Sequence, residues 1–293
     1  MTSNSEATRL RFKKIFFWFW IYTLLVILWG AWVRISHSGN GCGDHWPVCQ
    51  GEIIPDLTQK KTFIEYFHRL MSGAYGLIVI YLWWKLRQIQ KNNKLTHPFL
   101  ILMITEALLG AALVKFNLVT TNDSVMRLIF MSLHQLNSFM LTGVTYLLYK
   151  SFTPDFDFKL NRLHVLFILV PVTGAIAALS TTLFPTISLF QGIIEDFNSN
   201  SHIFIKLRIL HPLMALTIMI GFMSWLFQKG QNRLALETLF AVFIGIVTLV
   251  TLSPVYLKLS HLFIAHMLWA RYLGLSWGLT LKARSTQTGG INN

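Results

Sequence analysis

Runs of about twenty apolar residues recur along the whole chain, and a helix needs a run of that length to cross a bilayer. Hydrophobic residues make up 54% of the 293 residues and charged residues only 13%, whereas a soluble domain carries about a quarter charged residues. The sequence therefore predicts an all-α integral membrane protein with eight transmembrane helices. The predicted spans are 14–33, 66–84, 98–116, 126–149, 163–182, 203–227, 234–252 and 255–281.

The basic residues predict the orientation of these spans. The net charge is +13, and Lys and Arg gather on the N-terminal tail and the even-numbered connections, as at Lys13, Lys85 and Lys150. Because cytoplasmic segments carry an excess of Lys and Arg, we expect a bacterial cytoplasmic (inner) membrane protein with both termini cytoplasmic. The loop 34–64 then lies outside. The charge is explained by the membrane, and we expect no nucleic-acid partner.

Both cysteines of the chain, Cys42 and Cys49, lie in this loop, within the stretch "GCGDHWPVCQG". Disulfides form and persist on the oxidising outer side of a membrane, and the spacing of the two residues allows a bridge. We therefore expect a Cys42–Cys49 disulfide rather than two free thiols. Whether the bridge only fastens the loop or also takes part in redox chemistry stays open.

The two halves of the chain resemble each other in four places, each in the corresponding span. The matches are "GAWVRIS" from Gly30 with "GAIAALS" from Gly174, "HRLMSG" with "HPLMAL", "GAALV" with "GIVTLV", and "LHQLNS" with "SHLFIA". Internal repeats of this kind are typical of duplicated membrane folds. The sequence predicts two pseudo-symmetric four-helix bundles in parallel orientation, an N-terminal half 1–150 and a C-terminal half 151–293.

Each even-numbered span carries a histidine in its outer half, at His68, His134, His211 and His261. Ionisable residues in hydrocarbon are costly and usually functional, although a single histidine could instead join two helices by a hydrogen bond. Two histidines on facing helices can ligate a heme, which predicts one site at His68 and His134 and another at His211 and His261. His266 competes with His261, and zinc is the rival metal. The remaining histidines, expected to be solvated, are His37, His45, His97, His164 and His202.

Glu65 lies three residues before His68, so the two share a helix face. It is either an interfacial residue, exposed or paired with Arg69, or a carboxyl able to transfer protons beside a heme. The matching position in the second half is Arg208. Pro212, directly after His211, predicts a local break in its helix.

Glu106 lies deep in the third span, where a carboxyl group needs a partner that the sequence does not identify. Asn137 and Ser138 follow His134 by three and four residues, so they share its face. They could orient its second nitrogen or contact a ligand.

The motifs "EYFHRLMSG", "GCGDHWPVCQG" and "FPTISLFQGIIEDF" followed by "LRILHPLMAL" resemble those of the heme A synthase family over nearly the full chain. The resemblance implies an oxidoreductase that converts heme O to heme A by successive hydroxylations of a ring methyl group to a formyl group. It implies heme O as substrate at His68 and His134, Glu65 as catalytic residue, and heme b as cofactor at His211 and His261.

The same resemblance implies heme O synthase and terminal oxidase assembly factors as partners, together with an electron acceptor that the sequence does not identify. A departure is that the second half has no outer cysteine pair. Two alternatives remain open: a di-heme b-type electron carrier, and a heme transporter that performs no chemistry. The oligomeric state also stays open.

Overall fold

The computed structural model describes residues 3–45, 47–154, 158 and 162–288, so Trp46 of the cysteine loop lies outside the described residues. Regular structure within these ranges is helical, apart from one isolated β-bridge between Cys49 and Glu52. This confirms the all-α prediction for the described chain. The helices are α1 Ser3–Ile35, α2 Lys60–Ile89, α3 Thr96–Lys115, α4 Val125–Ser151, α5 Arg162–Leu183, α6 Leu189–Phe197, α7 Ile203–Arg208, α8 Leu210–Gln228, α9 Asn232–Val250 and α10 Val255–Thr288.

Five segments of the described chain are long and apolar enough to cross a membrane, and they coincide with five of the predicted spans. They are Glu6–Ile35, Thr96–Lys115, Leu163–Leu183, Ile203–Gln228 and Asn232–Val250. The other three predicted spans fall on α2, α4 and α10, which are 30, 27 and 34 residues long. These helices exceed the length that a bilayer requires but are more polar, and each carries one or two of the candidate histidines.

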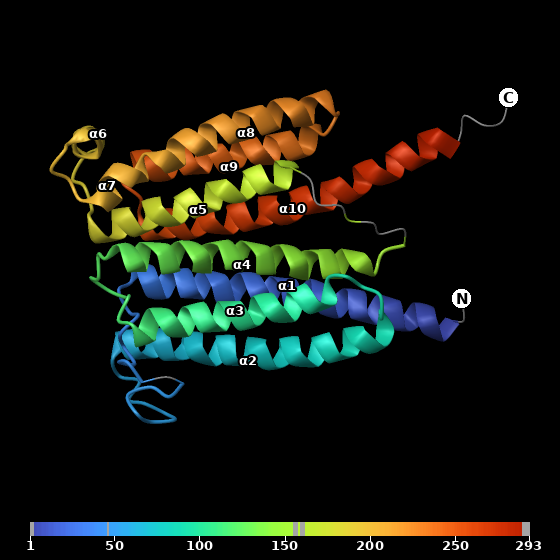
Figure 1. Cartoon of the computed structure of the whole chain (residues 1–293), viewed down its shortest axis with the longest axis horizontal. Helices are drawn as coiled ribbons and strands as arrows, with labels where there is room; N and C mark the ends of the chain where they lie inside the picture. Colours follow the sequence, from blue (N-terminus) through green and yellow to red (C-terminus); the bar gives the residue numbers. More distant parts are fainter. Residues whose placement is uncertain (1–2, 46, 155–157, 159–161, 289–293) are drawn as a thin grey trace.

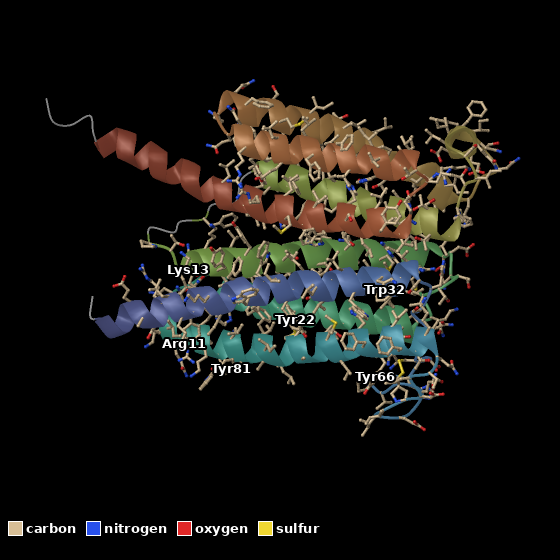
Figure 2. The ribbon with its side chains drawn as sticks, turned by 180° about the vertical axis from the view of Figure 1, so that it is seen from behind. Arg11, Lys13, Tyr22, Trp32, Tyr66 and Tyr81 are labelled. Atoms are coloured by element: carbon tan, nitrogen blue, oxygen red, sulfur yellow. A yellow bond between two sulfur atoms is a disulfide. The ribbon has the colours of Figure 1, made fainter. Side chains whose placement is uncertain are left out.

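The long helices lie side by side, and the connections at their two ends differ (Figure 1). The loop between α1 and α2, together with α6 and α7, lies at one end, which we call the loop end. Both termini lie at the opposite end. Figure 2 places the basic residues Arg11 and Lys13 toward the terminal end and Trp32 and Tyr66 toward the loop end.

The described core divides into two main hydrophobic clusters. One joins α1, α2, α3 and α4, and the other joins α5, α8, α9 and α10 with two residues of α4. Helix α4 therefore packs against both groups, with α1 and α3 on one side and α5 and α10 on the other. Gly143 makes the junction close, since a Cβ there would lie 2.6 Å from Nε1 of Trp269, whose indole donates to the Phe139 carbonyl at 2.9 Å.

The sixth predicted span is interrupted between α7 and α8, where α7 ends at Arg208 and α8 begins at Leu210. Pro212 has no N–H to bond the carbonyl four residues earlier, at Arg208, and its ring disfavours helix continuation there. The break expected near Pro212 is thus confirmed, and it lies just before His211.

His164 is 1% exposed and packs against Trp269 and Tyr272, with ring centroids 6.0 and 4.8 Å away. The expectation that this residue is solvated was wrong. The aromatic residues of α10 cover it, and such long-range packing cannot be inferred from a position near a span end.

Candidate functional site

Each of the four repeat-related histidines rests against a glycine of the preceding long helix. The glycines are those that mark the repeat in the sequence, and in every pair the closest imidazole atom is Cε1. A Cβ on the glycine would lie 2.9 Å from that atom for Gly30 and His68, 3.6 Å for Gly110 and His134, 3.1 Å for Gly174 and His211, and 2.9 Å for Gly245 and His261. Real Cβ atoms essentially never come within 3.0 Å of another heavy atom, so Gly30 and Gly245 make room for their rings. The contact at Gly174 is tight, and the contact at Gly110 is an ordinary van der Waals distance that leaves space for a Cβ.

The histidines face one another in the second half. The ring centroids of His211 and His261 are 6.1 Å apart, with an interplanar angle of 68°. Two imidazoles bound on opposite sides of one metal ion through bonds of about 2 Å lie roughly 6 Å apart between centroids, whereas tetrahedral ligation brings them closer. His266, the competitor on α10, instead stacks on Phe139 of α4 with centroids 3.8 Å apart. It therefore faces the junction between the halves.

In the first half, His68 lies on α2 and His134 on α4, and each lies against a glycine of the preceding helix. Among the described residues, no hydrogen-bond partner reaches Nδ1 of His68, His134 or His261. His211 differs, because its Nδ1 lies 3.3 Å from the hydroxyl of Thr173. An unsatisfied buried polar atom costs about 1–3 kcal/mol. Both ring nitrogens of His266 are unsatisfied as well, so this feature does not by itself distinguish the repeat-related histidines.

The donor sets come in pairs: no three His, Cys, Asp or Glu side chains group together within the described ranges. Zinc sites use three or four protein ligands, whereas a heme iron takes two axial ligands from facing helices. The facing rings of His211 and His261 and the glycines beside them fit a heme held between the two histidines, and the repeat extends this fit to His68 and His134.

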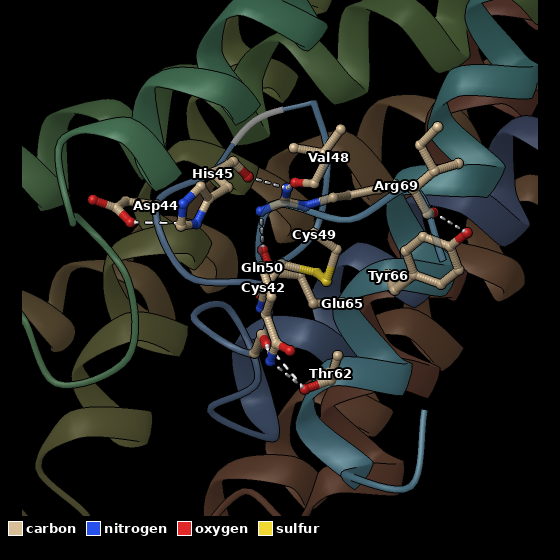
Figure 3. Close-up of a disulfide and its surroundings, with 12 residues drawn as sticks. Cys42, Asp44, His45, Val48, Cys49, Gln50, Thr62, Glu65, Tyr66 and Arg69 are labelled. Carbon is tan, nitrogen blue, oxygen red and sulfur yellow. Dashed lines mark hydrogen bonds and ion pairs between the residues drawn. A yellow bond between two sulfur atoms is a disulfide. The ribbon is translucent and has the colours of Figure 1, made fainter. Parts of the chain in front are cut away.

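Cys42 and Cys49 form a disulfide, as predicted, and both are fully buried (Figure 3). The loop that they close is fastened to the start of α2. The Thr62 hydroxyl donates to the Gly41 carbonyl at 2.9 Å. The amide of Gln50 donates to the same carbonyl at 3.0 Å.

Glu65 and Arg69, one turn apart on α2, both form hydrogen bonds to the same loop (Figure 3). Glu65 accepts a hydrogen bond from the backbone amide of Cys42 at 2.9 Å and another from Arg69 at 2.6 Å. Arg69 also donates to the carbonyls of His45 at 2.5 Å and Val48 at 2.6 Å. Glu65 is 3% exposed, so the exposed alternative is wrong and the pairing with Arg69 is confirmed.

In the second half, a residue just before the histidine helix also binds the connecting loop, but this residue is basic where Glu65 is acidic. Arg208, at the position that matches Glu65, donates to Asp196 at 2.5 Å, to Glu195 at 3.3 Å and to the Gly192 carbonyl at 2.9 Å. The acids belong to α6, the short helix of the connecting loop. Burial raises the pKa of Asp196, while the bond from Arg208 opposes that shift.

The structure supplies the partner of Glu106 that the sequence did not identify. Asn137 donates to one carboxylate oxygen at 2.6 Å, and the Ser138 hydroxyl donates to the other. That second oxygen lies 3.6 Å from Nδ1 of His134. Asn137 and Ser138 thus bond Glu106, and through it they lie next to His134, whose helix face they share.

Fold and site together define a membrane protein, helical throughout its described residues, with two pairs of half-buried histidines on neighbouring helices. The family model for the cytochrome oxidase assembly proteins matches residues 13–273. The chain belongs to this family.

Two sets of relatives match shares of the chain that differ in size. A Thermus thermophilus protein named Protoheme IX farnesyltransferase is 31% identical over 87% of this chain, but the match covers 46% of that relative. The heme A synthase of Alkalihalophilus pseudofirmus is 42% identical over 33% of this chain and 34% of its own. The heme A synthase of Halalkalibacterium halodurans is 40% identical over 32% of this chain. The chain thus spans less than half the length of the Thermus relative.

Proposed function

We propose that this protein is a heme A synthase, an oxidoreductase that converts heme O to heme A. The observation that carries the proposal is an asymmetry between two similar halves. Both contain a pair of histidines that lie against glycines, but the first carries an acid, Glu65, three residues before its histidine and bonded to a disulfide loop, whereas the second carries Arg208 at the matching position. The first half is therefore proposed to oxidise the substrate, and the second half to hold a heme cofactor.

The proposed architecture has eight transmembrane helices in two four-helix halves, 1–150 and 151–293. Helices α2, α4 and α10 cross the membrane despite their polarity, because their histidines and amides face neighbouring helices inside the bundle. The loop end is outside and both termini are cytoplasmic. The presence of Arg11 and Lys13 toward the terminal end, opposite the disulfide loop, supports this orientation.

In the first half, His68 and His134 hold the heme O substrate. Oxidising its methyl group to a formyl group with oxygen from water releases four electrons and four protons. Glu65 accepts and passes on protons from its position one helix turn before His68. Arg69 and the amide of Cys42 hold the carboxylate in place, and the disulfide loop limits access of bulk water.

In the second half, His211 and His261 hold a heme b. This cofactor supplies one-electron redox chemistry when bound, which suits transfer of the released electrons to an external acceptor in the membrane. The 6.1 Å separation of the two rings supports the assignment of His261, whereas the contact of His266 with Phe139 leaves that residue outside the site.

The proposed partners are heme O synthase and terminal oxidase assembly factors. The Thermus relative supports the first, because its name refers to farnesyl transfer and only 46% of its length matches this chain. A farnesyltransferase that modifies heme is the class of enzyme that would supply this substrate.

The test is to express the protein with a heme O synthase in a host that makes no heme A, and to identify extracted hemes by chromatography and mass. Heme A, or a hydroxylated precursor, should appear only when the wild-type chain is present. Bound heme b with heme O left unchanged, in a folded protein, would favour a di-heme electron carrier or a heme transporter instead.

A further inference from the structure

Glu106 is an acidic residue near the middle of α3, and Thr105 is the other polar side chain between Phe99 and Val114. Its side chain is 20% exposed. A carboxylate in such surroundings is costly unless it is hydrogen-bonded, and two donors from α4, Asn137 and Ser138, satisfy it. These donors explain how the carboxylate is held, but they do not explain why it is there.

The geometry points toward His134. One oxygen of Glu106 lies 3.6 Å from Nδ1 of His134, slightly beyond hydrogen-bond distance. No hydrogen-bond partner of that nitrogen is present among the described residues. When a histidine binds iron through Nε2, its remaining proton sits on Nδ1 and requires an acceptor. Metal-bound histidines commonly donate this proton to a carboxylate.

The repeat makes the feature specific to one site. Counting from Gly110 and Gly245, the position that matches Glu106 in the second half is Ala241. The residues three and four positions after His261 are Ile264 and Ala265, where His134 has Asn137 and Ser138. The histidine that has a partner in the second half, His211, meets a neutral hydroxyl, Thr173. A carboxylate therefore faces a ligand candidate in the first half, and its counterpart position in the second half cannot supply one.

We infer that Glu106 is a positioning residue that accepts the Nδ1 proton of His134 and thereby tunes the heme of the first half; the inference rests on the proposed function. A carboxylate acceptor fixes the tautomer and orientation of the imidazole and makes it a stronger electron donor to iron. A stronger donor favours oxidised iron, so the first heme has a lower reduction potential than it would have without Glu106. The second heme lacks this effect.

The experiment is a spectroscopic redox titration of the purified, heme-loaded full chain and its Glu106→Gln variant. Glutamine keeps the shape of the side chain and removes its charge. One of the two heme transitions should move to a more positive potential, the other should not move, and heme retention at the first site should weaken by about 10–100-fold. Thr105→Val, at the neighbouring position on α3, is the matched control and should move neither transition. Thr173→Val should affect only the other heme.

Unchanged potentials and retention in Glu106→Gln, or equal shifts of both hemes, would overturn the inference. If that variant does not fold, Ser138→Ala tests the same point, because it removes one donor that fixes the carboxylate. It should move the same transition in the same direction by less, and no movement would again count against the inference. If the wild-type chain binds no heme, it is the proposed function that fails.

Discussion

The carboxylate of Glu65 accepts a hydrogen bond from the backbone amide of Cys42 at 2.9 Å. This bond joins the disulfide loop to the helix that carries His68 and spans 23 positions of sequence. Glu65 therefore contacts the loop directly and lies one helix turn from a proposed heme ligand. Changes in the loop and in the site are expected to affect each other.

Glu65→Gln separates the chemical role of this residue from its structural role. Glutamine can still accept the bond from Cys42 but cannot carry a proton as a carboxylate does. Heme A formation should fall at least about 100-fold, the lower range for a general acid or base, while heme content stays normal. Product chromatography and heme content measured on the same preparation check both parts. Full product formation by this variant would remove Glu65 from the proposed mechanism.

Replacing both Cys42 and Cys49 with serine should lower stability by about 2–3 kcal/mol, the loop-closure entropy that so short a disulfide loop contributes. Thermal unfolding in detergent measures this loss. Adding reductant to the wild type provides the control and should shift its midpoint toward that of the double variant. Equal midpoints for wild type and variant would show that the contacts of Glu65 and Arg69 hold the loop without the bridge.

Gly30→Ala should weaken heme binding in the first half, because a Cβ would lie 2.9 Å from Cε1 of His68 and displace the ring. Gly73→Ala on α2 is the matched control, since nothing lies within 4 Å of its Cβ position. The control should retain heme and gain about 0.5–1 kcal/mol of helix stability. Absorbance of the bound heme and thermal unfolding report the two effects. Equal heme content in the two variants would contradict the glycine cradle.

Removing one partner of the ion pair between Arg208 and Asp196 should lower stability more than removing both partners. The two side chains are 9% and 8% exposed, and an unpaired buried charge costs about 3–5 kcal/mol. Arg208→Ala should therefore destabilise the protein more than the double variant Arg208→Ala with Asp196→Ala. A double-mutant cycle by thermal unfolding measures the coupling. Additive losses would mean that the pair is exposed to solvent and weak.

Much of this fold follows from local signals in the sequence. Long apolar segments predicted the helices. The position of Cys42 and Cys49 in a loop on the oxidising outer side of the membrane predicted the disulfide between them. The break before His211 followed from the backbone chemistry of Pro212. These features depend on residues near one another in the chain, so a single sequence contains the information.

Contacts between distant helices could not be predicted in the same way. Glu106 and Asn137 lie 31 positions apart, and only the packing of α3 on α4 brings them together. The burial of His164 depends likewise on α10. The glycines were visible as landmarks of the repeat, but their role as cradles became apparent only with the histidine rings in place.

The central claim is that each half holds one heme between its own pair of histidines, and heme content per chain tests it most directly. Purified wild-type protein should contain two hemes. Single alanine variants at His68, His134, His211 and His261 should each lose one, while His266→Ala should keep both. Loss of heme from His266→Ala, or two hemes retained in the variants of the four proposed ligands, would contradict the account.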